Sequence, residues 1–182
     1  MVSPVHVRSA MAGVEPRSAA HSLLLELAST LVGRPALTHD DSGRPHISGL
    51  AVSISYSRHR VAVAASHEGP VGIDLEEVQP RDFRPLADRW FTQRELEWMG
   101  QQPDQPIAFL RLWTAKEAVG KALGLGLRQS GLRREMPLDG GPVPSAPGLS
   151  VTRLLWVGGV LAVAAPNGAT VDQGVPPSVT DS

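Results

Sequence analysis

Two short acidic segments contain the residue types most able to do chemistry in this chain of 182 residues. They lie at residues 71–76 and 113–121. Together they supply three carboxylates and two ammonium groups: Asp74, Glu76, Glu117, Lys116 and Lys121. Carboxylate oxygens are ligands that Mg²⁺ prefers, and ammonium groups bind phosphate oxygens. If the segments meet in space, they can hold a divalent cation against a diphosphate, and the protein would break or transfer a phosphate ester.

The first acidic segment has the period of a β-strand. Because side chains alternate along residues 71–76, Ile73 and Leu75 point to one face. The two carboxylates, Asp74 and Glu76, then point together to the other face. A plainer interpretation is that they form the solvated end of a strand.

The second acidic segment fits a helix that follows the prolines of residues 103–106 and ends at Gly124. Glu117 and Lys121 are four residues apart and share a face of this helix. Alone, they could be an ordinary ion pair across one turn. The presence of both segments in one chain, with Trp113 ahead of the second, favours a joint chemical role.

Composition narrows the class of protein. Of the residues, 42% are hydrophobic, which suffices for a globular core, and the net charge of -1 gives no footprint for bulk nucleic-acid binding. There is no cysteine, so a metal must have oxygen or imidazole ligands. Residues 1–15 lack the hydrophobic run of a signal peptide, and no run is long enough to span a membrane. We therefore expect a cytoplasmic protein without nucleic-acid or membrane partners.

Periodicity predicts a helix and a hairpin in the first part of the chain. Leucines at helical spacing predict a helix over residues 17–32, with Pro16 at its start. Residues 38–45 are rich in Asp, Ser and Gly and are predicted to form a loop. Residues 52–57 alternate as a strand, and residues 61–65 are the predicted hairpin partner.

A second hairpin is predicted near the C-terminus. Residues 149–157 and 160–165 flank Gly158 and Gly159, a two-residue hairpin signal. Its apolar sequence echoes the first hairpin, which suggests two related α+β halves. Residues 166–182 have the composition of a disordered tail.

Two segments in between have local explanations. The spacing of Thr92 and Glu95 is that of a capping box, which opens a short helix to about Met99 and accounts for Glu95 structurally. Residues 136–147 are rich in Pro and Gly and are predicted to form a loop.

Three motifs together resemble a known family. They are Gly-Ile-Asp-x-Glu at 72–76, Trp-Phe-Thr-x-x-Glu at 90–95 and Trp-Thr-x-Lys-Glu-Ala at 113–118, followed by Lys121. The set is similar to that of the 4'-phosphopantetheinyl transferases of the surfactin-synthetase-activating (Sfp) type, in the W/KEA branch. The resemblance extends from about residue 17 to residue 165.

The resemblance implies an α+β fold of two pseudo-symmetric halves with coenzyme A in the cleft between them. We assign residues 1–70 to an N-terminal half, a helix plus a hairpin, and residues 71–165 to a C-terminal half with the metal and Lys-Glu-Ala motifs. Residues 166–182 are the predicted disordered tail. Because the two halves supply internally a site that smaller relatives assemble between subunits, we expect a monomer.

The resemblance also implies an Mg²⁺-dependent reaction. A serine hydroxyl of an apo acyl or peptidyl carrier protein attacks the β-phosphate of coenzyme A, accepts the phosphopantetheine arm and releases 3',5'-ADP. Asp74, Glu76 and Glu117 would hold Mg²⁺, and Glu117, or a water that it orients, would take the serine proton. Lys116 and Lys121 would bind phosphate oxygens. Asp74, Glu117 and Lys121 are thus the expected catalytic residues.

In the first half, the resemblance assigns contacts to coenzyme A. Arg44 and Pro45 match a Gly-Lys-Pro motif that approaches the adenine and its ribose phosphate, and Ser55 matches a phosphate-binding serine. Tyr56 replaces a histidine of the family pattern, and its phenol does not become cationic near neutral pH. The basic side chains that could compensate are Arg17, His21, Arg58 and His59.

The carrier protein is predicted to dock on residues 83–99 beside the cleft. Local positive charge would attract an acidic carrier helix. The charged residues concerned are Arg81, Arg84, Arg89 and Arg94.

Two other functions stay open from the sequence. An Mg²⁺-dependent diphosphate hydrolase would use the same carboxylates to activate water, and a non-catalytic carrier-protein or nucleotide-binding relative is suggested by Tyr56. The presence of all three carboxylates together with Lys121 favours the transferase.

Overall fold

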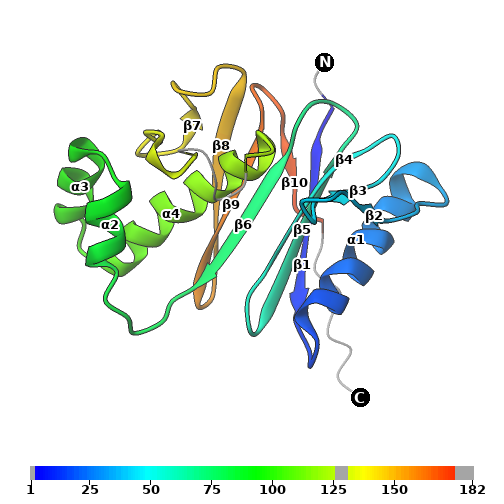
Figure 1. The fold of residues 1–182 in the computed structure, drawn as a ribbon, viewed down its shortest axis with the longest axis horizontal. Helices are drawn as coiled ribbons and strands as arrows, with labels where there is room; N and C mark the ends of the chain where they lie inside the picture. The colour runs from blue at the N-terminus through cyan, green and yellow to red at the C-terminus, as the bar shows by residue number, and fades with distance from the viewer. Residues whose placement is uncertain (1–2, 126–130, 175–182) are drawn as a thin grey trace.

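The computed structural model describes residues 3–125 and 131–174. The fold is α+β, with two β-sheets packed on each other and one long helix on the outer side of each (Figure 1). No helix in the described segments has the length and hydrophobicity needed to cross a membrane.

The first sheet and its helix come mainly from the first part of the chain. The elements are β1 (Val5–Met11), α1 (Pro16–Val32), β2 (Thr38–His39), β3 (Pro45–His46), β4 (Ala51–Tyr56) and β5 (Arg60–Ser66). The sheet has the strand order β10-β1-β5-β4, and β2 pairs with β3 in a separate ribbon. The predicted helix and hairpin are confirmed.

The second sheet, the three α-helices α2 to α4 and the last strand come from the rest of the described chain, and of these helices α4 packs on the sheet. The elements are β6 (Gly72–Glu77), α2 (Arg84–Trp90), α3 (Gln93–Gly100), α4 (Gln105–Ala122), a 3₁₀ turn (Gly131–Arg133), β7 (Gly141–Pro142), β8 (Leu149–Trp156), β9 (Gly159–Pro166) and, returning to the first sheet, β10 (Val171–Asp172). Its strand order is β6-β9-β8-β7.

The two sheets have the same connectivity. In each, an opening strand is followed by a long helix that packs on the sheet and then by a hairpin. The opening strand pairs antiparallel with the second hairpin strand, β1 with β5 and β6 with β9. This repetition agrees with the predicted fold of two pseudo-symmetric α+β halves.

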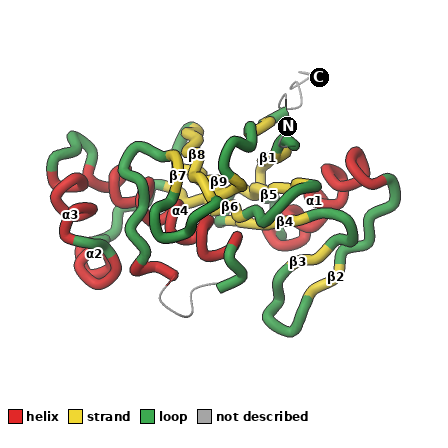
Figure 2. Tube along the Cα trace, turned by 90° about the horizontal axis from the view of Figure 1, so that it is seen from above, coloured by secondary structure: helices red, strands yellow, loops and turns green. Residues whose placement is uncertain are grey.

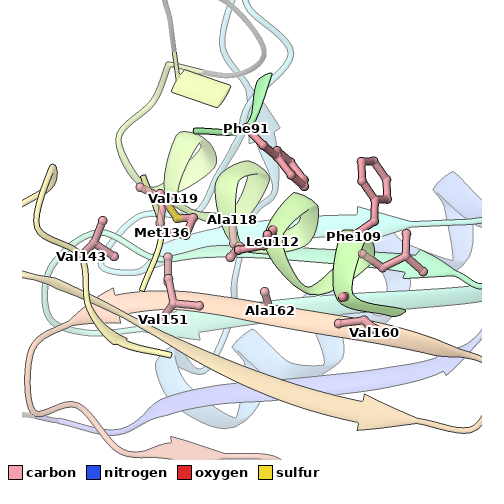
Figure 3. Packing of buried hydrophobic residues seen from close by; sticks show 14 of the residues in the cluster. Phe91, Phe109, Leu112, Ala118, Val119, Met136, Val143, Val151, Val160 and Ala162 are labelled. Carbon is pink, nitrogen blue, oxygen red and sulfur yellow. The ribbon is translucent and has the colours of Figure 1, made fainter. Parts of the chain in front are cut away.

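The alternation of the strands divides the core into layers. Ala64 of β5 and Ile73 and Leu161 of the second sheet lie in the cluster between the sheets. On the other face of the second sheet, Leu112 of α4 lies over Ala162 of β9, in one cluster with Val151 of β8 (Figure 3). The helix that carries the second acidic segment is therefore fixed on the strand face opposite Ile73.

Side chains near in sequence fix the start of α3 and of α4. Thr92 accepts a hydrogen bond from the backbone N–H of Glu95, and the Glu95 carboxylate accepts one from the backbone N–H of Thr92, so the predicted capping box is confirmed. The Asp104 side chain accepts from the N–H of Ile107 and begins α4 in the same way.

Two predictions about the ends of the chain are wrong. The first half opens with β1, where the sequence predicts only a helix and a hairpin. The predicted tail is ordered as far as residue 174, because β10 pairs in parallel with β1, with Val5 opposite Val171. Both strands are stabilised by partners distant in sequence, so neither has a strong local signal. Residues 175–182 lie outside the described residues.

Three details of the loops also differ from prediction. Trp156 pairs with Gly159, so the hairpin turn is Val157-Gly158 and not the two glycines, and Gly158 adopts a φ of 97° that favours glycine. The predicted loops contain the short strands β2 and β3 and, further on, β7. The short helix α2 has no counterpart in the sequence prediction.

Candidate functional site

The two acidic segments meet where the edge strands of the two sheets, β4 and β6, lie side by side (Figures 1 and 2). A pocket of about 350 Å³ opens there, which we call the carboxylate pocket. Its lining residues come from β4, β6 and α4: Ile54, Ser55, Tyr56, Asp74, Leu75, Glu76, Glu117 and Lys121. The predicted meeting of Asp74, Glu76, Glu117 and Lys121 is thus observed.

Gly72 allows α4 to lie close enough to β6 to complete this pocket. A Cβ atom on Gly72 would lie 1.9 Å from the carbonyl oxygen of Ala118 and 2.7 Å from the backbone nitrogen of Ala122. Those backbone atoms belong to the helical turns that carry Glu117 and Lys121. A larger residue would push these side chains away from the acidic strand.

Asp74 is the most buried carboxylate of the pocket. Its Oδ1 lies 2.8 Å from Nζ of Lys121 and accepts a hydrogen bond of 3.0 Å from the Ser55 hydroxyl. Its Oδ2 is buried and has no hydrogen-bond partner among the described residues. Burial raises the pKa of Asp74, while Lys121 and Ser55 act in the opposite direction.

Glu76 and Glu117 also have raised pKa values. Burial is the main cause for both, and repulsion from Asp74 is the second. The pKa of Glu117 rises to about 7, although the Lys121 ammonium opposes the shift. The pocket therefore holds more negative charge than its own cation neutralises.

This arrangement fits a hard divalent cation in its donor chemistry. The unpaired Oδ2 of Asp74 and the raised pKa values of the other two carboxyl groups show that an additional positive charge would stabilise the pocket. Within residues 3–125 and 131–174, no three acidic or histidine side chains already stand together as a metal-ligand set.

Lys121 connects the carboxylate pocket to a second pocket of about 300 Å³. Arg44 and Pro45 line this second pocket, which we call the Arg44 pocket, together with Ser53 and Gly124. The Arg44 guanidinium lies against Gly124 at the end of α4. An anionic ligand would thus meet Lys121 at the centre and Arg44 at one end.

Ser55 and Tyr56, both predicted to contact coenzyme A, line the carboxylate pocket. The Tyr56 side chain is 49% exposed, so its phenol is available to a ligand. The Ser55 hydroxyl is already engaged, because it donates to Asp74 and accepts from the backbone N–H of Leu75.

The prediction that Lys116 binds phosphate is contradicted by its position. The side chain is fully buried, and its Nζ lies 2.8 Å from a carboxylate oxygen of Glu95, which is buried equally. Nζ also donates to the carbonyl oxygen of Arg134, and the Glu95 carboxylate accepts from the N–H of Met136. Lys116 and Glu95 therefore join α3 and α4 to the segment 134–136, and the interpretation of Glu95 as structural is confirmed.

Arg17 and His21 do not line either pocket in the described part of the chain. Arg17 is exposed on α1, and the His21 ring lies 4.9 Å from the ring of His39. Burial and the neighbouring charges of His39 and Arg17 lower the pKa of His21. Their predicted role as replacements for a cationic residue at Tyr56 has no support from this geometry.

The sequence analysis missed Ser53 and Arg81 as residues of the site. Ser53 lines the Arg44 pocket and accepts from the backbone N–H of Ile73, and the charge of Arg81 lowers the pKa of Glu76. Ser53 was detectable, because it is two residues from Ser55 in an alternating strand and shares its face. Arg81 follows β6 in a loop without a periodic signal.

Comparison with known proteins finds similarity to 4'-phosphopantetheinyl transferases. Residues 70–145 match the family model of the 4'-phosphopantetheinyl transferase superfamily. The 4'-phosphopantetheinyl transferase HetI of Nostoc sp. is 33% identical over 133 residues, which cover 68% of this chain and 55% of HetI. The 4'-phosphopantetheinyl transferase AcpT of Salmonella typhimurium is 36% identical over 104 residues, 54% of either chain. The 4'-phosphopantetheinyl transferase psf-1 of Bacillus pumilus is 31% identical over 137 residues, 62% of this chain and 58% of the relative.

Fold and site define an α+β protein with an acidic pocket, suited to a divalent cation, at the junction of two similar halves. The comparisons support the 4'-phosphopantetheinyl transferase superfamily, whose model matches residues 70–145. The chain spans little more than half the length of the curated relatives it matches.

Proposed function

We propose that this protein is an Mg²⁺-dependent 4'-phosphopantetheinyl transferase of the Sfp type, W/KEA branch, that converts apo carrier proteins to their holo form. The serine oxygen of the carrier forms a bond to the β-phosphorus of coenzyme A. The bond from that phosphorus to the bridging oxygen breaks, and 3',5'-ADP leaves. The observation that carries the proposal is the convergence of three carboxylates and Lys121 in one pocket.

In this proposal, Asp74, Glu76 and Glu117 would hold Mg²⁺, and the bound ion would supply positive charge against the diphosphate. Lys121 contacts phosphate oxygens at the junction of the two pockets. In the metal-free protein, burial and the neighbouring carboxylates raise the pKa of Glu117 to about 7. In the proposed reaction, the Glu117 carboxylate, or a water that it orients, takes the serine proton.

We place coenzyme A along the two connected pockets. The diphosphate lies in the carboxylate pocket and the adenosine part reaches Arg44 and Pro45 in the Arg44 pocket. Tyr56 lies beside the diphosphate, where its phenol donates a hydrogen bond without adding charge. We further propose that the protein acts as a cytoplasmic monomer, with residues 1–70 and 71–165 as its two halves.

Intact-protein mass spectrometry of apo carrier proteins tests the proposal. With coenzyme A and Mg²⁺, we expect a gain of about 340 Da, the mass of the phosphopantetheine arm joined covalently to serine. The gain should vanish with EDTA and with Glu117→Gln, and persist with Glu26→Gln, a control at an exposed glutamate of α1 outside both pockets and the docking segment.

The other outcomes point to the alternative functions. Consumption of coenzyme A without a mass gain on any carrier would indicate a diphosphate hydrolase. Carrier binding that survives Glu117→Gln, with coenzyme A left intact by the wild type, would indicate a non-catalytic binding protein.

A further inference from the structure

The junction between β4 and β6 lacks the usual connection between neighbouring strands. Each is the edge strand of its own sheet, and no backbone ladder joins them in the described part of the chain. Edge strands present unpaired N–H and C=O groups, which are costly when buried. Side chains satisfy these groups at this junction.

Two serine hydroxyls of β4 accept hydrogen bonds from backbone N–H groups of β6 that point toward β4. The N–H of Ile73 donates to Oγ of Ser53, and the N–H of Leu75 donates to Oγ of Ser55, both at 3.1 Å. Both serines are buried, with 5% and 6% of their surface exposed. The spacing of two residues on each strand places the two bonds on either side of Asp74.

Lys121 satisfies carbonyl groups of the same junction. Its Nζ donates to the carbonyl oxygen of Ile54 at 3.2 Å and to that of Ile73 at 2.9 Å, besides its contact with Asp74. A phosphate group bound to Lys121 would compete with these carbonyl groups for the N–H donors of the Lys121 ammonium. The two serine bonds do not depend on Lys121 and would persist.

We propose that Ser53 and Ser55 are positioning residues of the carboxylate pocket. Their hydroxyl groups hold the strand that carries Asp74 at a fixed register against the first half, so that the carboxylates of one half face the ligand-binding residues of the other. The single proton of Ser55 is donated to Asp74, which gives this serine a structural partner in place of a phosphate. The catalytic part of this inference rests on the proposed transferase function.

Amide hydrogen exchange, measured by NMR, tests the positioning role independently of activity. In Ser53→Ala and Ser55→Ala, exchange at Ile73 and Leu75 respectively should accelerate by about tenfold or more, because the N–H groups lose their acceptors. Ser66→Ala is the matched control, since Ser66 is fully buried on β5 and makes two hydrogen bonds with the backbone of Glu68, away from the junction. Cys variants at 53 and 55 keep the volume and weaken the acceptor, should the alanine variants fail to fold.

The second measurement is the affinity for coenzyme A in the presence of Mg²⁺, by calorimetry. Ser53→Ala should weaken binding by about tenfold through misplacement of the pocket. Ser53→Thr, which keeps the hydroxyl, should restore it, and Ser66→Ala with a similar loss of Tm should bind normally. Unchanged exchange at Ile73 and Leu75, or equal losses of affinity in all alanine variants, would overturn the proposal. A wild type that binds coenzyme A but modifies no carrier would refute the transferase and leave the exchange result to decide the positioning role.

Discussion

Glu117 illustrates how the electrostatics of single residues link stability to function. Burial and two neighbouring carboxylates raise its pKa to about 7, so in the metal-free folded protein it holds a proton that the unfolded chain releases near pH 4.5. The stabilisation from this group is complete below pH 4.5 and is lost as the pH rises through 7. Above pH 7 the ionised carboxylate destabilises the folded state.

We therefore expect Glu117→Gln to stabilise the metal-free protein at pH 8 and to be neutral at pH 4. The full pKa shift corresponds to about 3 kcal/mol, and solvent screening of this partly exposed group reduces the expected gain to about 1 kcal/mol. Urea unfolding in EDTA at both pH values measures the effect, with Glu97→Gln as control. A gain that is the same at pH 4 and pH 8 would contradict the assignment.

Lys116 and Glu95 form a buried ion pair, and breaking it should damage the fold and not the chemistry. Lys116→Met leaves the Glu95 charge buried without its cation, at a cost of about 3–5 kcal/mol. The double variant Lys116→Met/Glu95→Gln should recover part of this loss. Chemical unfolding measures it, and coenzyme A affinity per folded molecule should stay unchanged. A selective loss of affinity with normal stability would restore the phosphate-binding role.

At the level of elements, the site depends on the contact between α4 and β6. Both acidic segments are placed by regular structure, one by the alternation of β6 and the other by the spacing of α4. The distance between these elements is set by Gly72, since a Cβ there would overlap the backbone at Ala118. This glycine thus acts on the site without contacting a ligand.

We expect Gly72→Ala to destabilise the protein by about 1–3 kcal/mol. It should also weaken Mg²⁺-dependent coenzyme A binding by more than the loss of folded protein accounts for. The helix must shift because backbone atoms cannot rotate away. Thermal unfolding and calorimetry measure the two effects. Gly100→Ala is the control, because no described heavy atom lies within 4 Å of its added Cβ, and it should be neutral or slightly stabilising. Equal behaviour of the two variants would exclude a special role for Gly72.

For the whole molecule, the arginines around α2 and α3 form the surface on which we expect an acidic carrier to dock. Arg89 is exposed and lies over the ring of Trp90, with its guanidinium carbon 5.0 Å from the ring centre. Arg94 pairs with Glu135 at 2.9 Å but remains 67% exposed. Opposite charge on a partner increases mainly the association rate and is screened by salt.

Charge reversal at Arg89 and Arg94 should raise the KM for the carrier protein by about tenfold, with little change in the KM for coenzyme A. Steady-state kinetics at two salt concentrations measures the effect, which should shrink at high salt. Arg34→Glu, at an exposed arginine after α1 in the first half, is the matched control. An unchanged carrier KM would refute docking at this surface.

Most of the regular elements, and the carboxylate and ammonium groups of the site, could be predicted from the residue pattern. Leucines at helical spacing predict α1, and alternation predicts the first hairpin. The prolines before α4 and the glycine after it predict that helix, and two glycines predict the second hairpin. Alternation alone placed Asp74 and Glu76 on the same side of a strand. The strands β1 and β10 are not predicted, because β1 pairs with β5 and β10, and β10 pairs with β1, all of them distant in sequence.

The contact partners of the polar side chains could not be predicted, because they depend on how distant elements pack. Lys116 and Lys121 belong to the same helix and the same motif, yet one turns into the core toward Glu95 and the other toward Asp74. Likewise Ser53 and Ser55 became bridging groups because two sheet edges happen to lie together without a backbone ladder. Spacing along a helix or strand fixes relative direction, whereas the identity of a partner depends on the packing of elements distant in sequence.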